Sequence, residues 1–109
     1  MNLGVRERQR YRDISWLMPS VDVRGVLERL GVERIRRNGD EIEALCPDHK
    51  LFKGCESSHP NWTVNVHTGV TFCRTEPRSS NLVWTVARLL ECHPREAAAF
   101  MLARTVTST

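Results

Sequence analysis

The chain has 109 residues, of which 40% are hydrophobic, and this length suits one small domain with a thin stability margin. The sequence contains no apolar run long enough to span a membrane, and its N-terminus is too polar for a signal peptide. We therefore expect a cytoplasmic protein that has no membrane partner. The net charge of +3 is a mild basic excess, which is compatible with nucleic acid as a partner without requiring it.

The first segment, residues 1–19, is polar and rich in arginine, and we interpret it as an N-terminal extension. It has a narrow apolar edge that is compatible with a helix, formed by Ile14, Leu17 and Met18. We treat this extension as an appendage to a domain that spans residues 20–104. Residues 105–109 are expected to form a frayed tail.

A short amphipathic helix is predicted to open the domain. Its apolar residues recur at helical spacing and comprise Val23, Val26, Leu27 and Leu30. Ser20 or Asp22 can cap the start of this helix, and Gly31 can end it. The helix is therefore expected to bury a single apolar stripe.

Two hairpins are predicted to follow the helix. The turn dipeptide Asn38-Gly39 separates ERIRR from EIEALC, and these flanks can pair with Ile42 and Ala44 on one face. In HPNWTVNVHTGVTFC, apolar and polar residues alternate before Thr68-Gly69 turns the chain. The apolar set of that alternation is Trp62, Val64 and Val66.

Two helices are predicted at the C-terminal end, after RTEPRSSN, which we interpret as a loop. The first runs from about Asn81 to Glu91, and its apolar side consists of Leu82, Val83, Val86, Leu89 and Leu90. The second starts at Pro94 with Ala97, Ala98 and Met101 facing inward. The fold class predicted from this order is α+β, with a small antiparallel sheet of three to four strands flanked by helices.

A metal site is indicated by the cysteine and histidine residues near the ends of the predicted strands. Cys46 and His49 are separated by two residues, which is typical spacing for half of a tetrahedral zinc site. Cys73 lies at the end of another strand, and Glu76 follows it at the same spacing. In a cytosolic chain, four cysteines favour metal binding over disulfides. Zn²⁺ is therefore the predicted cofactor.

From about Ser20 to Ala103, the sequence resembles the zinc-ribbon domain at the N-terminus of bacterial and phage DNA primases. The ordered points of likeness are VDVRGVLERLG, LCPDH, PNWTV, GVTFC and the helix pair NLVWTVARLLECHPREAAAFML. The resemblance implies a zinc-ribbon-like sheet, zinc ligands at Cys46, His49 and Cys73, and contact with single-stranded template DNA. We expect no counterpart of the primase polymerase domain in this sequence, because it offers no carboxylate cluster for Mg²⁺.

The fourth metal ligand stays open at the sequence level. Glu76 has the family spacing but is a harder ligand than a thiolate. An insertion, LFKGCESSH, supplies Cys55 and His59 as further candidates, and Cys55 has the right chemistry. The remaining alternatives are a fold that has lost its metal, and an open zinc of the hydrolase type, which lacks a general base beside it. An iron–sulfur cluster is disfavoured because no two cysteines form a close pair. We interpret Cys92 as a small core side chain.

The predicted function is that of a nucleic-acid-binding zinc-ribbon module rather than an enzyme. Its binding surface combines aromatic and basic side chains, drawn from Lys50, Lys53, Trp62, Phe72, Arg74 and Arg78. Trp62 is equally compatible with the core. We expect single-stranded DNA as the ligand, in replication or priming of a phage, plasmid or other mobile element, together with a separate primase, polymerase or other replication protein. The alternative is a protein–protein adaptor that keeps the scaffold with an altered or lost metal site.

Overall fold

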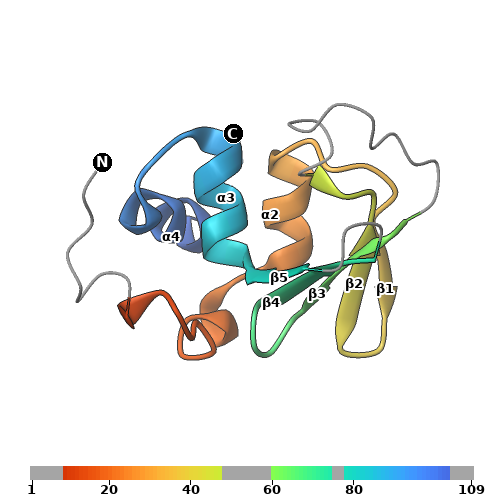
Figure 1. Cartoon of the computed structure of the whole chain (residues 1–109), viewed down its shortest axis with the longest axis horizontal. Coiled ribbons are helices and arrows are strands. Elements are labelled where there is room, and N and C mark those ends of the chain that lie inside the picture. Colours follow the sequence, from red (N-terminus) through yellow and green to blue (C-terminus); the bar gives the residue numbers. More distant parts are fainter. Residues whose placement is uncertain (1–8, 48–59, 75–77, 104–109) are drawn as a thin grey trace.

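The computed structural model describes residues 9–47, 60–74 and 78–103, which form five antiparallel strands and three α-helices (Figure 1). This confirms the α+β class, with one strand more than expected. The strands follow the order β1-β2-β3-β4-β5 across the sheet. Their bounds are β1 Arg36–Asn38, β2 Glu41–Ala44, β3 Trp62–Asn65, β4 Val70–Cys73 and β5 Arg78–Asn81. The helices are α2 Val23–Arg29, α3 Leu82–Leu90 and α4 Pro94–Leu102, and a 3-10 turn, η1, covers Met18–Ser20.

Helix α2 begins and ends as its sequence predicts. The side chain of Asp22 accepts a hydrogen bond from the backbone N of Gly25 at 3.1 Å and thereby caps the first turn. Gly31 has a φ of +75°, a left-handed conformation that ends the helix, and Val32 N then donates to Leu27 O at 3.0 Å. The chain is thus turned from α2 towards β1.

Both predicted hairpins form. Asn38 pairs with Glu41, so Gly39 and Asp40 occupy the turn, one residue later than the dipeptide indicated. In the second hairpin, the carboxamide oxygen of Asn65 accepts hydrogen bonds from the backbone N of His67 at 2.8 Å and of Thr68 at 3.0 Å. This turn returns the chain so that β4 pairs with β3.

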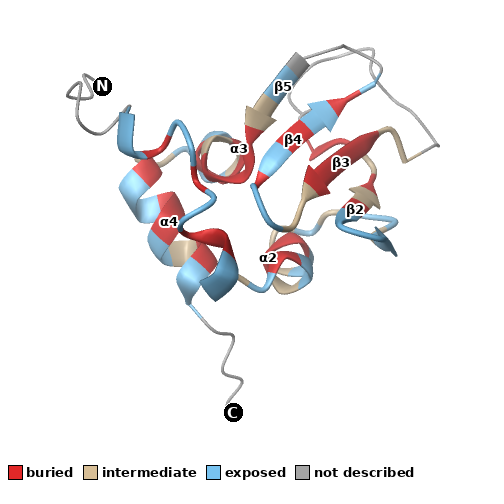
Figure 2. Ribbon diagram, turned by 90° about the horizontal axis from the view of Figure 1, so that it is seen from below, coloured by how far each residue is buried: buried red, intermediate tan, exposed pale blue. Residues whose placement is uncertain are grey.

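The core lies between the helices and one face of the sheet. The inward side chains of β2 and β3 are at most 2% exposed, and they are Ile42, Ala44, Trp62 and Val64. They form one cluster with fully buried residues of α2 and α3, namely Val26, Leu27, Leu82, Val83 and Val86. Figure 2 shows this burial on β3, α2 and α3. The opposite face of the sheet, called here the outer face, carries the alternate side chains.

Strand β5 lies within the segment that the sequence indicated as a loop. Its residues pair with β4 from Val70↔Asn81 to Cys73↔Arg78. Asn81 ends this strand and also caps α3, because its side chain accepts from the backbone N of Trp84 at 3.1 Å. The strand therefore continues into α3 without an intervening loop.

The N-terminal segment from residue 11 is part of the core, so its interpretation as an appendage was wrong. Its buried side chains are at most 5% exposed and comprise Tyr11, Ile14, Leu17 and Met18. The carbonyl oxygen of Tyr11 accepts hydrogen bonds from Asn81 Nδ2 at 2.7 Å and from Trp84 Nε1 at 3.0 Å. In Figure 1 the segment leads to η1 beside the turn that joins β3 and β4. The domain thus begins before residue 20.

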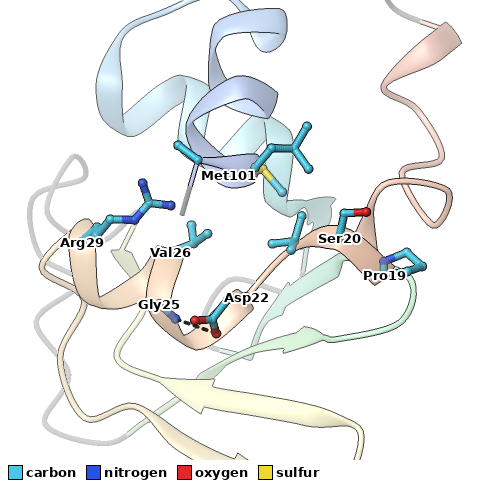
Figure 3. A pocket seen from close by; sticks show the side chains of 10 residues that line it. Pro19, Ser20, Asp22, Gly25, Val26, Arg29 and Met101 are labelled. Atoms are coloured by element: carbon cyan, nitrogen blue, oxygen red, sulfur yellow. Dashed lines mark hydrogen bonds between the residues drawn. The ribbon is translucent and has the colours of Figure 1, made fainter. Parts of the chain in front are cut away.

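Helix α4 is joined to α2 by an arginine. Arg29 Nη2 donates to the carbonyl oxygen of Phe100 at 2.8 Å, and the guanidinium lies 4.1 Å from the centre of the Phe100 ring. A hollow of about 450 Å³ opens beside this contact, and Figure 3 shows Arg29, Val26 and Met101 around it. Among the residues that the structure describes, no helix is long and apolar enough to cross a membrane.

Candidate nucleic-acid interface and metal-ligand positions

The outer face of the sheet carries a row of side chains that crosses all five strands. The pairing register places Arg36, Glu43, Thr63, Phe72 and Ser79 in this row. Phe72 is 41% exposed, and Val70, two residues earlier on the same face, is 48% exposed. Side chains of β4 alternate between exposed and buried, so the strand presents these two apolar groups to solvent. An aromatic ring therefore lies open near the middle of the outer face.

Charged groups lie on the same face of the sheet, on strands β1 and β2. Arg36 donates from Nη2 and Nε to Glu43 Oε1 at 2.5 and 3.1 Å, and Asn38 Nδ2 donates to Oε2 at 3.0 Å. These hydrogen bonds, led by that from Arg36, lower the pKa of Glu43, and the charge of Arg74 adds to the effect. Glu43 therefore remains ionised and balances Arg36, while Arg74 is exposed at the end of β4.

The predicted nucleic-acid residues separate into four groups. Phe72 is exposed on the outer face, and Arg74 is exposed just after β4. Trp62 is 1% exposed on the inward face, so its assignment to a binding surface was wrong. Arg78 begins β5. Lys50 and Lys53 lie outside the described residues.

Two of the predicted metal ligands lie at the same end of the sheet. Trp62 pairs with both Ala44 and Cys73, so β2 and β4 end on either side of the start of β3. Cys46 follows β2 by two residues, and Cys46 and Cys73 are each 6% exposed. Thiol groups are typical ligands of a structural zinc site, and they are softer ligands than carboxylates.

The other candidate ligands, namely His49, Cys55, His59 and Glu76, lie outside the described residues. Within residues 9–47, 60–74 and 78–103, no three His, Cys, Asp or Glu side chains form a metal-binding group. The described part therefore contains half of the predicted ligand set, and it leaves open which residue completes that set.

Cys92 is separate from this group. It lies between α3 and α4, where it is partly buried against the core. Burial, with a smaller contribution from Glu96, raises the pKa of the Cys92 thiol. The protonated thiol is a poor metal ligand. Its expected role as a small packing residue fits this environment.

A further exposed group was missed at the sequence level. Trp16 is 50% exposed, and the guanidinium of Arg10 lies 4.8 Å from its ring centre. The Trp16 indole donates to the carbonyl oxygen of Arg10 at 3.2 Å. Val70 was missed as well, although its spacing from Phe72 places both residues on one face of a strand.

No family model and no curated protein sequence matches this chain. The resemblance to primase zinc-ribbon domains therefore depends on the ordered sequence motifs alone.

Proposed function

We propose that the outer face of the sheet binds single-stranded DNA, with Phe72 as the ring on which an unpaired base stacks. The observation that carries this proposal is the 41% exposure of Phe72 in the row that crosses the sheet. A large aromatic side chain open to water costs hydrophobic free energy in a free protein, and stacking against a base recovers it. The role is replication or priming of a mobile element, in partnership with a separate catalytic protein.

Basic residues would follow the phosphates on either side of that base. Arg74 is exposed beside Cys73, and Arg36 lies at the other side of the outer face. Glu43 neutralises Arg36 in the unbound protein, so Arg74 supplies the stronger attraction. This surface is mildly rather than strongly basic, which favours single strands held by stacking over duplex DNA held by charge.

Fluorescence anisotropy with a labelled single-stranded oligonucleotide tests the proposal. Phe72→Ala should weaken binding by about 5- to 150-fold, the equivalent of about 1–3 kcal/mol for one stacked base. Leu90→Ala is the matched control, because Leu90 is 42% exposed and lies on α3, away from the outer face. Equal affinities of the wild type and the Phe72 variant would reject the stacking role.

We also propose that Zn²⁺ is held by Cys46, His49 and Cys73, with Cys55 as the fourth ligand and Glu76 as the alternative. The burial of Cys46 and Cys73 at one end of the sheet supports a site of this kind. Such an ion would be structural, because its binding free energy contributes to folding.

Elemental analysis should find about one zinc per chain, and Cys46→Ser should lower both zinc content and thermal stability. Cys92→Ser is the control and should retain the metal. A stable, metal-free wild type would mean that the scaffold has lost its ion, while the DNA proposal would remain open to its own test.

A protein–protein adaptor is the second candidate, and the neighbouring exposed residues Val70 and Phe72 favour it, since they form an apolar pair. The dependence of binding on salt concentration distinguishes DNA binding from an adaptor function. DNA binding weakens as salt rises because counterions are released, whereas an apolar protein contact does not.

A further inference from the structure

A hollow of about 620 Å³ lies where the N-terminal segment meets the outer face of β4 and β5. Val70 of β4 pairs with Asn81 of β5, and both line the hollow together with Ser79. Arg12, Asp13 and Ile14 line it from the N-terminal segment, and Trp84 lines it from α3. The hollow therefore exists only because the N-terminal segment is part of the fold.

Its position places it directly next to Phe72. Ser79 lies opposite Phe72 in the sheet register, and Val70 is two residues from Phe72 along the same face of β4. Two residues of a strand span roughly 6.7 Å, which is comparable with one step of an extended nucleic-acid strand. A strand whose base stacks on Phe72 can thus bring its neighbouring nucleotide to the hollow.

We propose that this hollow holds one unpaired base of the single strand that stacks on Phe72, and that it prefers a base with an exocyclic amino group. The inference rests on the proposed function. It extends that function by assigning a second base site and a selectivity to the N-terminal segment.

The chemistry of the lining matches a base. Val70 and Trp84 supply apolar surface for the faces of a ring, while polar side chains supply hydrogen-bonding groups for its edge. Asp13 Oδ1 accepts from Ser15 N at 3.0 Å and from Ser15 Oγ at 2.8 Å. These bonds fix the carboxylate and lower its pKa. An ionised carboxylate only accepts hydrogen bonds, so it favours the amino group of cytosine over the carbonyl group of thymine.

Arg12 adds a positive charge at the same wall. It is exposed and lines the hollow next to Asp13. A phosphate that links the two bound nucleotides would meet Arg12, whereas the base edge would meet Asp13. Arg12 is therefore expected to strengthen the binding of every DNA sequence, whereas Asp13 is expected to make the affinity depend on the base.

Binding of oligo(dC) and oligo(dT) of equal length separates these effects. The wild type should prefer oligo(dC) by about 10- to 150-fold, the size expected for one hydrogen bond to a charged group, and Asp13→Asn should bring this ratio close to one. Arg12→Ala should weaken both complexes to a similar degree. Arg24→Ala is the control, since Arg24 is an exposed arginine on α2 and should leave both affinities unchanged.

Nuclear magnetic resonance gives a measurement that does not depend on these variants. The indole N–H of Trp84 should shift when oligo(dC) is added, because its ring lines the hollow. The indole N–H of Trp62, in the core, should stay in place.

The outcomes distinguish this inference from the proposed function. Binding of neither oligonucleotide by the wild type would overturn both. Binding that depends on Phe72, with an unmoved Trp84 signal and an unchanged preference in Asp13→Asn, would overturn the base site alone. A shifted Trp84 signal without preference for oligo(dC) would contradict the selectivity assigned to Asp13.

Discussion

Gly69 is the residue where the N-terminal segment and the second hairpin meet. Its φ is +76°, and a Cβ atom there would collide with Ile14 and approach the sulfur of Met18 to 3.0 Å. Gly69→Ala combines a left-handed alanine with an overfilled core, so we expect it to lower the free energy of unfolding by about 2–4 kcal/mol. Urea denaturation measures the loss.

Gly31 offers the matched control for this prediction. Its φ is +75°, but a Cβ atom there would meet nothing within 4 Å. Gly31→Ala should therefore cost only the backbone contribution of about 1–2 kcal/mol. Equal losses at the two positions would mean that the packing of Ile14 on Gly69 contributes nothing.

Glu43 makes stability depend on pH. Its pKa is lowered in the folded protein, chiefly by the hydrogen bond from Arg36. The contribution is therefore present above the pKa of the unfolded chain and is lost as the pH falls through the lower folded value. The melting temperature of the wild type should exceed that of Glu43→Gln at about pH 6, and this difference should shrink towards about pH 3.

Replacement of Arg36 tests whether its hydrogen bond is the cause of the lowered pKa of Glu43. In an Arg36→Gln background, the pH-dependent change in melting temperature that Glu43→Gln produces should be much smaller. If Glu43→Gln changed the melting temperature equally in the wild type and in Arg36→Gln, a group other than Arg36 would lower the pKa of Glu43.

Asn81 connects three elements, because it ends β5, caps α3 and binds the N-terminal segment. Its side chain accepts from Trp84 N at 3.1 Å and donates to Tyr11 O at 2.7 Å. Asn81→Ala removes both bonds, and we expect unfolding to become easier by about 1–3 kcal/mol. Chemical denaturation of this variant and of Ser80→Ala, which should stay near the wild type, provides the comparison.

Asn81→Asp distinguishes the two bonds. A carboxylate still caps α3, but it no longer donates to the Tyr11 carbonyl oxygen. Its stability should fall below that of the wild type. Full stability in this variant would show that the bond to the N-terminal segment is unimportant.

Elements with a clear period were predictable from the sequence. The apolar residues of α2 recur at helical spacing between Asp22 and Gly31, and both of these boundary residues act as expected. Strand β5 was not predictable, because RSSN has no alternation of apolar and polar residues. Its strand conformation comes from pairing with β4, which is a tertiary effect.

Trp62 marks a second limit of sequence-based prediction. Alternation normally separates a core face from a solvent face, but β3 is central in the sheet, and Trp62, Thr63 and Val64 are all buried. A pattern along one strand therefore did not reveal which face is open. The exposed aromatic residue is Phe72, on the neighbouring strand.

At the scale of the whole molecule, the N-terminal segment is required for the core. Ile14 is 1% exposed, whereas Trp16, two residues later, is 50% exposed. Ile14→Ala should lower stability by about 2–5 kcal/mol, a large share of what a small domain possesses. Trp16→Ala should cost less than about 1 kcal/mol. Thermal unfolding of the two variants measures the contrast, and similar melting temperatures would restore the interpretation as an appendage.

The candidate metal ligands Cys46 and Cys73 could be placed from the sequence only as far as the strands that precede or carry them. The sequence placed Cys46 and Cys73 at strand ends, and the sheet register brings these strand ends to one side of the molecule. The candidates for a fourth ligand, Cys55 and Glu76, lie outside the described residues. Spacing alone does not choose between them, because loop closure tolerates many lengths at small cost.

The central claim is that the outer face binds single-stranded DNA, and the salt dependence of binding tests it most directly. Anisotropy titrations between about 50 and 200 mM salt should show a measurable loss of affinity for the wild type, of the size expected for a few phosphate contacts. Arg74→Ala should lower the slope of log affinity against log salt by about one. A wild-type affinity that does not change with salt, or a slope that Arg74→Ala leaves unchanged, would contradict the claim.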